Sequence, residues 1–364
     1  MICLFAVFAF QQQAKLSADT EQPRVKLGPR ANGLRVGPGM NAVGTELRGT
    51  EIVGQNLSGS IFDRCNLDGV RIYQCDLSNA SFKSAKLTGA TIDDCKIDSA
   101  DFSDAVINGW LPIYRGGMTM LTPDQLKTTR SYRTKDLSRC SITAAARNKQ
   151  NRRIRCEYDF SNANLENADL FGGDFRDSDF TNAKVTGLRI SGCKFAFRQL
   201  ASTLSYREKS LRNLDLSVTF DGPESPDFSD VDLTNTRFSS RFRPDAIFAD
   251  AKISGCAFQK SISFTQIAAT KNFKQRDLTG IRFSRLNLAN GDFSNVDLSG
   301  AYFNYCDLTN AKFNDAIVTG SWFDSCSGLT ESQIKSTWNF KNGRVHQIKQ
   351  LPGELADIVK SAVE

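Results

Sequence analysis

Residues 57–102 read LSGSIFDRCNLDGVRIYQCDLSNASFKSAKLTGATIDDCKIDSADF, and a large apolar residue recurs in them at every fifth position. The series begins earlier, at Leu47, and continues unbroken to Ile107. The residue two places before each apolar one is usually Ala, Cys or Ser, and the other positions are mostly polar or Gly. Neither a helix nor a flat strand keeps a five-residue step on one side. The spacing therefore predicts a backbone that turns a corner every five residues.

A second period, of twenty residues, relates residues that are four corners apart. The phenylalanines that follow it are Phe62, Phe82, Phe102, Phe283, Phe303 and Phe323. In a coil with four five-residue sides they would lie above one another at about 4.8 Å, the usual spacing of paired strands. Stacked rings in a dry interior also explain why 26 Phe outnumber 7 Tyr and 3 Trp, because a buried hydroxyl or indole N–H needs a partner.

The segments 100–104, 163–167 and 168–172 read ADFSD, ANLEN and ADLFG. This pattern resembles the pentapeptide-repeat family. The resemblance implies an all-β solenoid, a right-handed quadrilateral β-helix in which the central Leu or Phe and the small residue two before it point inward. The same five-residue step returns over 160–195, over 228–258 with a break at Arg243, and over 278–323.

A third period separates four copies of a longer motif in which Gln, Thr, an aromatic residue and a basic residue recur at fixed offsets. Its glutamines are Gln125, Gln199, Gln266 and Gln333, separated by 74, 67 and 67 residues. We interpret each copy as a short helical turn joining two stretches of coil, and Thr122 and Thr330 fit capping boxes. The basic residue that follows Tyr or Phe in each copy is amphipathic and can lie over the aromatic ring.

The three periods together predict four related units and a set of boundaries. The expected segments are 1–18, an apolar signal-like stretch; 19–46, an irregular lead-in; 47–124, repeat block 1; 125–198, a connector plus block 2 with a basic insertion at 143–159; 199–265, a connector plus block 3; 266–332, a connector plus block 4; and 333–364, the last connector with a C-terminal capping helix. Residues 1–10, MICLFAVFAF, resemble the apolar centre of an export signal, although no basic residue precedes them. Export is one interpretation, and a cytoplasmic protein whose N-terminal tail packs on the fold is the other.

Few residues of this chain suit catalysis. The single histidine, His346, excludes centres that need several His ligands and leaves Ser or Cys nucleophiles without the usual base. Most cysteines take the small position of the repeat, where thiols replace Ala as buried side chains; these are Cys65, Cys75, Cys95, Cys140, Cys193, Cys256 and Cys306. Many aspartates precede the central residue and would line exposed corners rather than a cleft. We therefore predict no catalytic residue, no metal site and no cofactor.

One basic segment is not required by the repeat. Residues 125–155 hold ten basic residues against Asp136 alone, a net charge of +9, whereas the whole chain carries +6. A candidate anion-binding patch lies in its second half, at Arg147, Lys149, Arg152, Arg153 and Arg155. A solvated loop is the alternative interpretation, and the lack of aromatic residues between 147 and 155 argues against single-stranded nucleic acid as the ligand.

The leading functional hypothesis is a non-enzymatic scaffold whose partner is another protein, since a filled interior leaves no cleft for a small-molecule substrate. A homodimer formed through the solenoid ends is a further option. The alternative hypothesis is nucleic-acid or polyanion binding through residues 125–155. Some members of the family resembled here shield DNA topoisomerases by imitating duplex DNA, which needs a strongly negative rod, yet residues 47–107 carry only −3.

Overall fold

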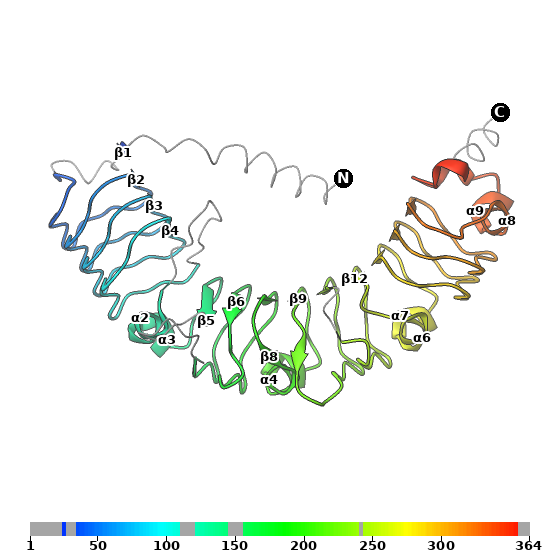
Figure 1. Ribbon diagram of the computed structural model, residues 1–364, viewed down its shortest axis with the longest axis horizontal. Coiled ribbons are helices and arrows are strands. Elements are labelled where there is room, and N and C mark those ends of the chain that lie inside the picture. The colour runs from blue at the N-terminus through cyan, green and yellow to red at the C-terminus, as the bar shows by residue number, and fades with distance from the viewer. Residues whose placement is uncertain (1–23, 27–33, 110–120, 145–155, 240–242, 356–364) are drawn as a thin grey trace. The chain divides into compact units, whose positions relative to one another are not determined.

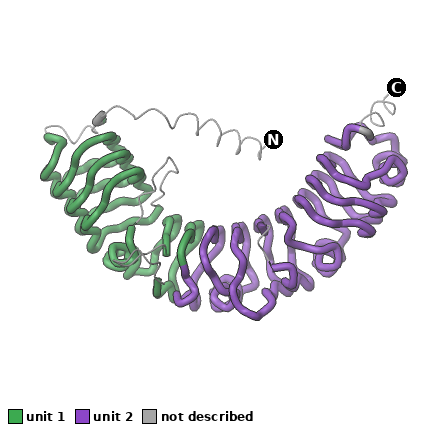
Figure 2. Tube along the Cα trace, in the orientation of Figure 1, with its two compact units in different colours: residues 1–173 green, residues 174–364 purple. Residues whose placement is uncertain are grey.

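The computed structural model describes residues 24–26, 34–109, 121–144, 156–239 and 243–355 (Figure 1). They form two compact units, one ending at Gly173 and the other beginning at Asp174, coloured green and purple in Figure 2. Each unit is a stack of coils whose short strands pair in parallel from one coil to the next. Among the described residues, no helix has both the length and the apolar character needed to cross a membrane.

In the first unit, four ladders set five residues apart close each coil. β2 (Glu51–Val53), β3 (Arg71–Tyr73) and β4 (Thr91–Asp93) form one ladder, in which residues twenty apart lie side by side. Single bridges form the other three, exemplified by Ile61 with Ser81, Asn66 with Lys86, and Asp76 with Lys96. β1 (Arg24–Lys26) pairs antiparallel with β2, and β5 (Ser141–Ala144) pairs parallel with β6 (Asp169–Gly173). The predicted right-handed quadrilateral β-helix is confirmed.

The second unit repeats the design with its own parallel ladder. Its strands in ladder order are β7 (Arg189–Ser191), β9 (Asp215–Ser217), β11 (Arg237–Phe238), β12 (Ala257–Gln259), β13 (Arg282–Ser284), β14 (Tyr302–Asn304) and β15 (Trp322–Asp324). β8 (Phe195–Ala196) pairs parallel with β10 (Phe220–Asp221). Within this unit the helices lie on the side of the coils away from the strands labelled β9 and β12 (Figure 1).

Stacked apolar side chains fill the interior. Phe62, Phe82 and Phe102 are fully buried, and their nearly parallel rings have centroids 4.9 Å apart. Phe303 and Phe323 stack in the same way at 5.0 Å. Because the rings follow the strand spacing, each phenylalanine packs directly against the ring of the coil before it. Burial of each side chain contributes about 2–3 kcal/mol to the stability of the fold. The excess of Phe in the composition therefore reflects interior columns.

The polar positions of the repeat hold the corners. Asp76 Oδ1 accepts a hydrogen bond from the N–H of Ser78 at 2.9 Å, and Asp101 Oδ1 accepts one from Ser103 at 2.8 Å. The second central residue of such a turn has positive φ, as at Asn79 (57°), where the N–H of Ala80 donates to Leu77 O. Asn, Asp and Gly reach this conformation at the least cost. The recurring Asp, Ser and Asn are thus parts of the turn, which accounts for their exposed positions at the corners.

Each connector contains two short helices, where a single helical turn is the expectation from sequence. The pairs are α2 (Pro123–Thr128) with α3 (Arg130–Arg133), α4 (Phe197–Ala201) with α5 (Leu204–Arg207), α6 (Phe264–Ala269) with α7 (Lys271–Lys274), and α8 (Glu331–Lys335) with α9 (Trp338–Lys341). The capping boxes at Thr122 and Thr330 are present. A buried Leu or Ile of the first helix of each pair enters the interior, as Leu126 and Ile334 do.

The Thr between the two helices explains why there are two. Thr129 is fully buried, and its hydroxyl donates to the carbonyl of Leu126 at 2.7 Å while accepting from the N–H of Tyr132 at 3.2 Å. One side chain thereby ends α2 and caps the start of α3. The same pair of bonds occurs at Thr203, Thr270 and Thr337.

The Gln of each connector binds the coil that precedes it. Gln199 Nε2 donates to the carbonyls of Phe175 and Ser178 at 2.6 and 2.7 Å, and its Oε1 accepts from the N–H of Ala196 at 2.9 Å. Gln125, Gln266 and Gln333 make the equivalent three bonds. The connector replaces one side of a coil, so some backbone groups next to it have no strand partner there. The glutamine amide supplies the two N–H donors and the one oxygen acceptor that pair with these groups.

The ends and one predicted break complete the fold. The ladder reaches back to Gly39, whose N–H donates to Ser58 O at 2.8 Å, so part of the expected lead-in 19–46 already belongs to a coil. The predicted break at Arg243 is a surface position, where the Arg243 side chain binds Asp245 and Gly222 O.

At the C-terminal end, the short 3-10 helices η1 (Val345–Gln347) and η2 (Gly353–Leu355) follow α9. The signal-like stretch 1–18 and most of the expected C-terminal helix lie outside the described residues, and the predicted segment boundaries stay predictions.

Candidate functional site

The five residues predicted to bind anions lie outside the described residues, as does most of the insertion 143–159. These are Arg147, Lys149, Arg152, Arg153 and Arg155, and their role stays a prediction. The described part of the basic segment contains the other five basic residues: Lys127, Arg130, Arg133, Lys135 and Arg139. Their surroundings show what this part of the segment does.

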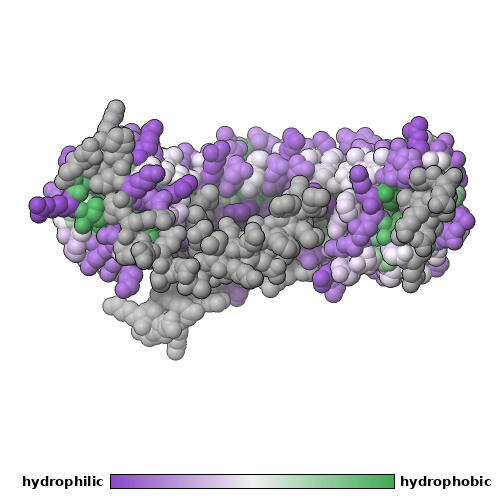
Figure 3. Space-filling model, turned by 90° about the horizontal axis from the view of Figure 1, so that it is seen from above, coloured by the Kyte–Doolittle hydropathy of each residue, from purple (hydrophilic) through white to green (hydrophobic). Residues whose placement is uncertain are grey.

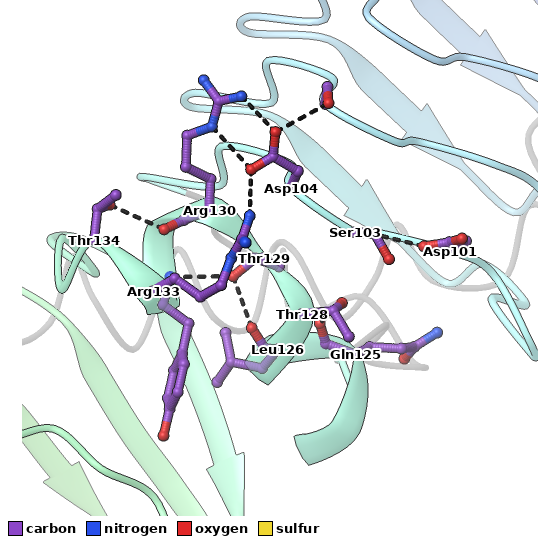
Figure 4. Close-up of polar contacts among 12 residues, drawn as sticks. Asp101, Ser103, Asp104, Gln125, Leu126, Thr128, Thr129, Arg130, Arg133 and Thr134 are labelled. Atoms are coloured by element: carbon purple, nitrogen blue, oxygen red, sulfur yellow. Dashed lines mark hydrogen bonds and ion pairs between the residues drawn. The ribbon is translucent and has the colours of Figure 1, made fainter.

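Asp104 binds two of these cations, Arg130 and Arg133, at the first connector (Figure 4). It sits at a coil corner with φ of 61°. Arg130, the first residue of α3, donates from Nε to Oδ1 at 3.1 Å and from Nη2 to Oδ2 at 2.5 Å. Arg133, one turn further along, binds Oδ1, and Ser84 Oγ donates to Oδ2 at 3.1 Å. The hydrogen bond and charge of Arg130 lower the pKa of Asp104 to about 2, so the carboxylate stays ionised.

The basic residue of each connector does not lie over the preceding aromatic ring, so that interpretation was wrong. It binds the residue of positive φ in the coil before it, and the pairs are Arg133 with Asp104, Arg207 with Asn182, Lys274 with Asp250, and Lys341 with Asp315. The tyrosine rings are covered from further along the chain, by Lys135 at 5.7 Å from the Tyr132 centroid and by Lys209 at 5.8 Å from that of Tyr206. A carboxylate or amide oxygen within reach binds a cation more strongly than an exposed ring does.

Lys135 and Lys127 are also engaged within the first unit. Lys135 Nζ lies 2.7 Å from Asp159 Oδ2, and its hydrogen bond is the main reason that the pKa of Asp159 falls to about 2. Lys127 Nζ lies 5.8 Å from the ring centroid of Tyr158. Arg139 is exposed and borders a surface hollow of about 520 Å³ together with Asn164 and Glu166. The first half of the basic segment therefore serves mainly to hold the connector against its neighbouring coils.

The aspartates that precede the central residue of the repeat, such as Asp76 and Asp307, accept hydrogen bonds and are not suited to proton transfer. The hydroxyl and N–H of Ser78 lower the pKa of Asp76, and Thr309 does the same for Asp307. A general acid needs the opposite shift at neutral pH. His346 lies in η1 with an exposed side chain. Over the described ranges, no group of three or more His, Cys, Asp or Glu side chains is placed to hold a metal ion.

The cysteines of the repeat lie where small side chains are needed. Cys65 and Cys256 are fully buried, and their thiols donate to the carbonyls of Ala42 (2.7 Å) and Leu233 (3.0 Å) in the coil before. Burial raises the pKa of both thiols. Such groups are protonated hydrogen-bond donors of the interior, not nucleophiles.

Comparison with solved structures finds similarity to two proteins at low sequence identity. HetL, a pentapeptide repeat protein involved in heterocyst differentiation regulation from the cyanobacterium Nostoc sp. strain PCC 7120, is 16% identical over 82% of this chain and 89% of its own, with a TM-score of 0.20. A trypsin-treated form of QnrB1, a plasmid-mediated fluoroquinolone resistance protein, is 16% identical over 63% of this chain and 94% of its own, with a TM-score of 0.18. A search of curated proteins finds no match.

The family comparison agrees with the ladders and the buried columns. The family described as pentapeptide repeats matches in eight copies, over residues 41–79, 65–104, 159–195, 272–303 and 292–327. These ranges contain the corners held by Asp and Asn and the stacked interior rings described above. The matched stretches of the chain are therefore pentapeptide repeats, as the sequence pattern predicted.

Proposed function

We propose that this protein is a non-enzymatic scaffold that binds another protein through the flat sides of its coils. The observation that carries the proposal is that different positions of each five-residue side have different structural roles. The central side chain is buried in the interior, and the polar residues beside it hold the turn, as Asp101 and Ser103 do. What remains for function is the outward-facing row of side chains, which varies from coil to coil.

The outward rows supply a broad polar surface. On the side seen in Figure 3, most of the described surface is hydrophilic, with small hydrophobic areas. Neighbouring rows lie one strand spacing apart, about 4.8 Å, so a partner meets a regular two-dimensional array of side chains. Interfaces of this kind gain affinity from a few aromatic or Arg anchors within a larger polar area.

The test compares two sides of the first unit by charge reversal. Arg71→Glu changes an exposed residue of β3, and Lys86→Glu changes an exposed residue of a different ladder. Sedimentation first establishes whether the wild-type protein binds a second copy of itself. Cross-linking with mass spectrometry then maps any bound protein. A partner that is lost with one variant and kept with the other, with cross-links on the affected side, supports the proposal.

Two results would contradict it. One is a metabolite consumed by the purified wild-type protein and left intact by the buffer control, which would point to catalysis. The other is a partner whose cross-links all fall outside the coils and whose binding neither variant changes. Both the metabolite assay and the cross-linking experiment use the full-length protein, and neither needs the partner to be known in advance.

A further inference from the structure

Three successive coils of the second unit carry outward aromatic and basic side chains on the same side. The strand residues 282–285, 302–305 and 322–325 read RFSR, YFNY and WFDS, and they lie in register. Since Phe283, Phe303 and Phe323 are buried, their neighbours in sequence face outward. We call this surface the aromatic–basic face, and its members are Lys260, Arg282, Arg285, Tyr302, Tyr305 and Trp322.

The aromatic rings of this face are accessible and closely spaced. The centroids of Tyr302 and Trp322 are 6.2 Å apart, and both side chains are partly exposed. Tyr305 is 59% exposed. The guanidinium carbon of Arg285 lies 5.7 Å from the Tyr305 ring centroid, so a cation and a ring already share this surface. The face therefore offers one pair of neighbouring rings, Tyr302 with Trp322, and one ring with a guanidinium beside it, Tyr305 with Arg285.

The backbone at Tyr305 adds a second observation. Its φ is 53°, in the left-handed region that a bulky aromatic residue rarely adopts. The same column holds Lys260, Arg285 and Ser325, also at positive φ. Asn would fit this corner with less strain, as it does at many other corners of the chain. An exposed ring kept at a costly backbone position is the kind of outlier that points to a role outside folding.

The charge of the face is positive. Lys260, Arg282 and Arg285 are exposed, and none of them lies in an ion pair with a carboxylate in the described part of the chain. The acidic residue of these three strands, Asp324, accepts hydrogen bonds from Tyr302 Oη and Gln350 Nε2. Three cations around three rings therefore face one carboxylate that is already engaged by its neighbours.

We propose that the aromatic–basic face binds single-stranded nucleic acid. Exposed rings accept bases by stacking, which is tolerant of sequence, and flanking Arg and Lys neutralise the phosphates. A flat side suits a single strand, whereas a duplex hides its bases from side-chain stacking. An acidic polypeptide would match the charge but would leave the row of rings without a planar partner. This activity is separate from protein scaffolding and from the predicted patch at Arg147–Arg155.

The test measures fluorescence anisotropy of a labelled oligothymidylate with the full-length protein. We expect binding that weakens with salt, with a slope of log affinity against log salt of about −2 for three phosphate contacts on a single strand. Tyr305→Asn should lower the affinity about tenfold, because stacking on one ring is lost. Since Asn suits the left-handed corner, the thermal midpoint should stay level or rise, which separates lost binding from lost folding.

Charge variants give matched controls. Arg282→Gln should weaken binding and flatten the salt slope by about 0.7. Lys271→Gln removes the same charge from an exposed residue of α7, on another side of the coil, and should leave both the affinity and the salt slope unchanged. A chain neutralised at the five residues 147, 149, 152, 153 and 155 should also keep its sensitivity to Tyr305→Asn.

Three outcomes would overturn the proposal. The first is no binding of oligothymidylate at protein concentrations up to tens of micromolar. The second is binding that Tyr305→Asn leaves unchanged, which would mean attraction by charge alone. The third is polyglutamate that binds as tightly and with the same dependence on Tyr305, which would assign the face to an acidic polypeptide.

Discussion

Replacing Gln199 by Met tests the role assigned to the connector glutamines. The change keeps the length of the side chain and its apolar stem but removes three hydrogen bonds to backbone groups of a site that is only 5% exposed. Phe175 O keeps a second bond, from the N–H of Ser178 at 2.8 Å. Ser178 O and the N–H of Ala196 lose the bond that Gln199 provides. At about 1–3 kcal/mol for each of these two buried groups, the expected loss of unfolding free energy is about 2–6 kcal/mol.

Equilibrium urea unfolding and native-state hydrogen exchange measure this loss together. A solenoid need not unfold in one step, so the exchange of amides in residues 175–200 locates the effect. Gln259→Met, at an exposed residue of β12, is the matched control and should change the free energy of unfolding by less than about 0.5 kcal/mol. Gln333→Met removes equivalent bonds at a partly exposed site and should fall between the two, because water can replace some of them. If Gln199→Met matches the Gln259 control, the glutamines do not hold the connectors and the reasoning fails.

Three further predictions follow from the interior, the corners and the ion pairs. Phe82→Asp, which puts an unpaired charge between two rings stacked at 4.9 Å, should abolish cooperative unfolding, whereas Phe82→Leu should cost only about 1–2 kcal/mol, as measured by urea titration. Asp104 and Asp159 have folded pKa values of about 2, below the unfolded value of about 3.9, so the stability that their ionised forms contribute is present above pH 4 and is lost as the pH falls toward 2. Asp104→Asn should flatten this part of the curve of urea midpoint against pH. An unchanged curve would count against the ion pairs. Tyr305→Asn should raise stability by about 0.5–1 kcal/mol through relief of the left-handed backbone, and calorimetry showing a lower midpoint would contradict the assignment of strain.

Most of the coil architecture could be predicted from sequence because it depends on local periodicity. The five-residue step at Leu47–Ile107 and the twenty-residue recurrence of Phe62, Phe82 and Phe102 each report a repeated backbone geometry. The Asp and Asn corners could have been predicted as well, since Asp and Asn commonly accept a hydrogen bond from the N–H two residues later in a turn, as Asp76 and Asp101 do.

The connectors were harder because their key contacts are distant in sequence. Arg133 binds Asp104, which lies 29 residues earlier in the sequence. No local pattern shows that the Arg133 side chain meets this carboxylate and not the ring of the adjacent Tyr132. Thr129 looked like one polar residue of a single turn, and only its position between two helix ends gives it two roles. The aromatic–basic face did leave a signal, because aligning RFSR, YFNY and WFDS at the twenty-residue period places their outer residues in two columns.

The direction of the connector contacts bears on how the chain folds during synthesis. Gln125 and Arg133 bind groups in the coil that leaves the ribosome before them, at Ala100 and Asp104. The Tyr132 hydroxyl then accepts from the N–H of Asp159, which emerges later. Each connector can therefore close the coil already made and present a ring to the next one, so growth proceeds from the N-terminus in small steps. A stalled or truncated chain would end in a finished coil rather than in an open apolar edge.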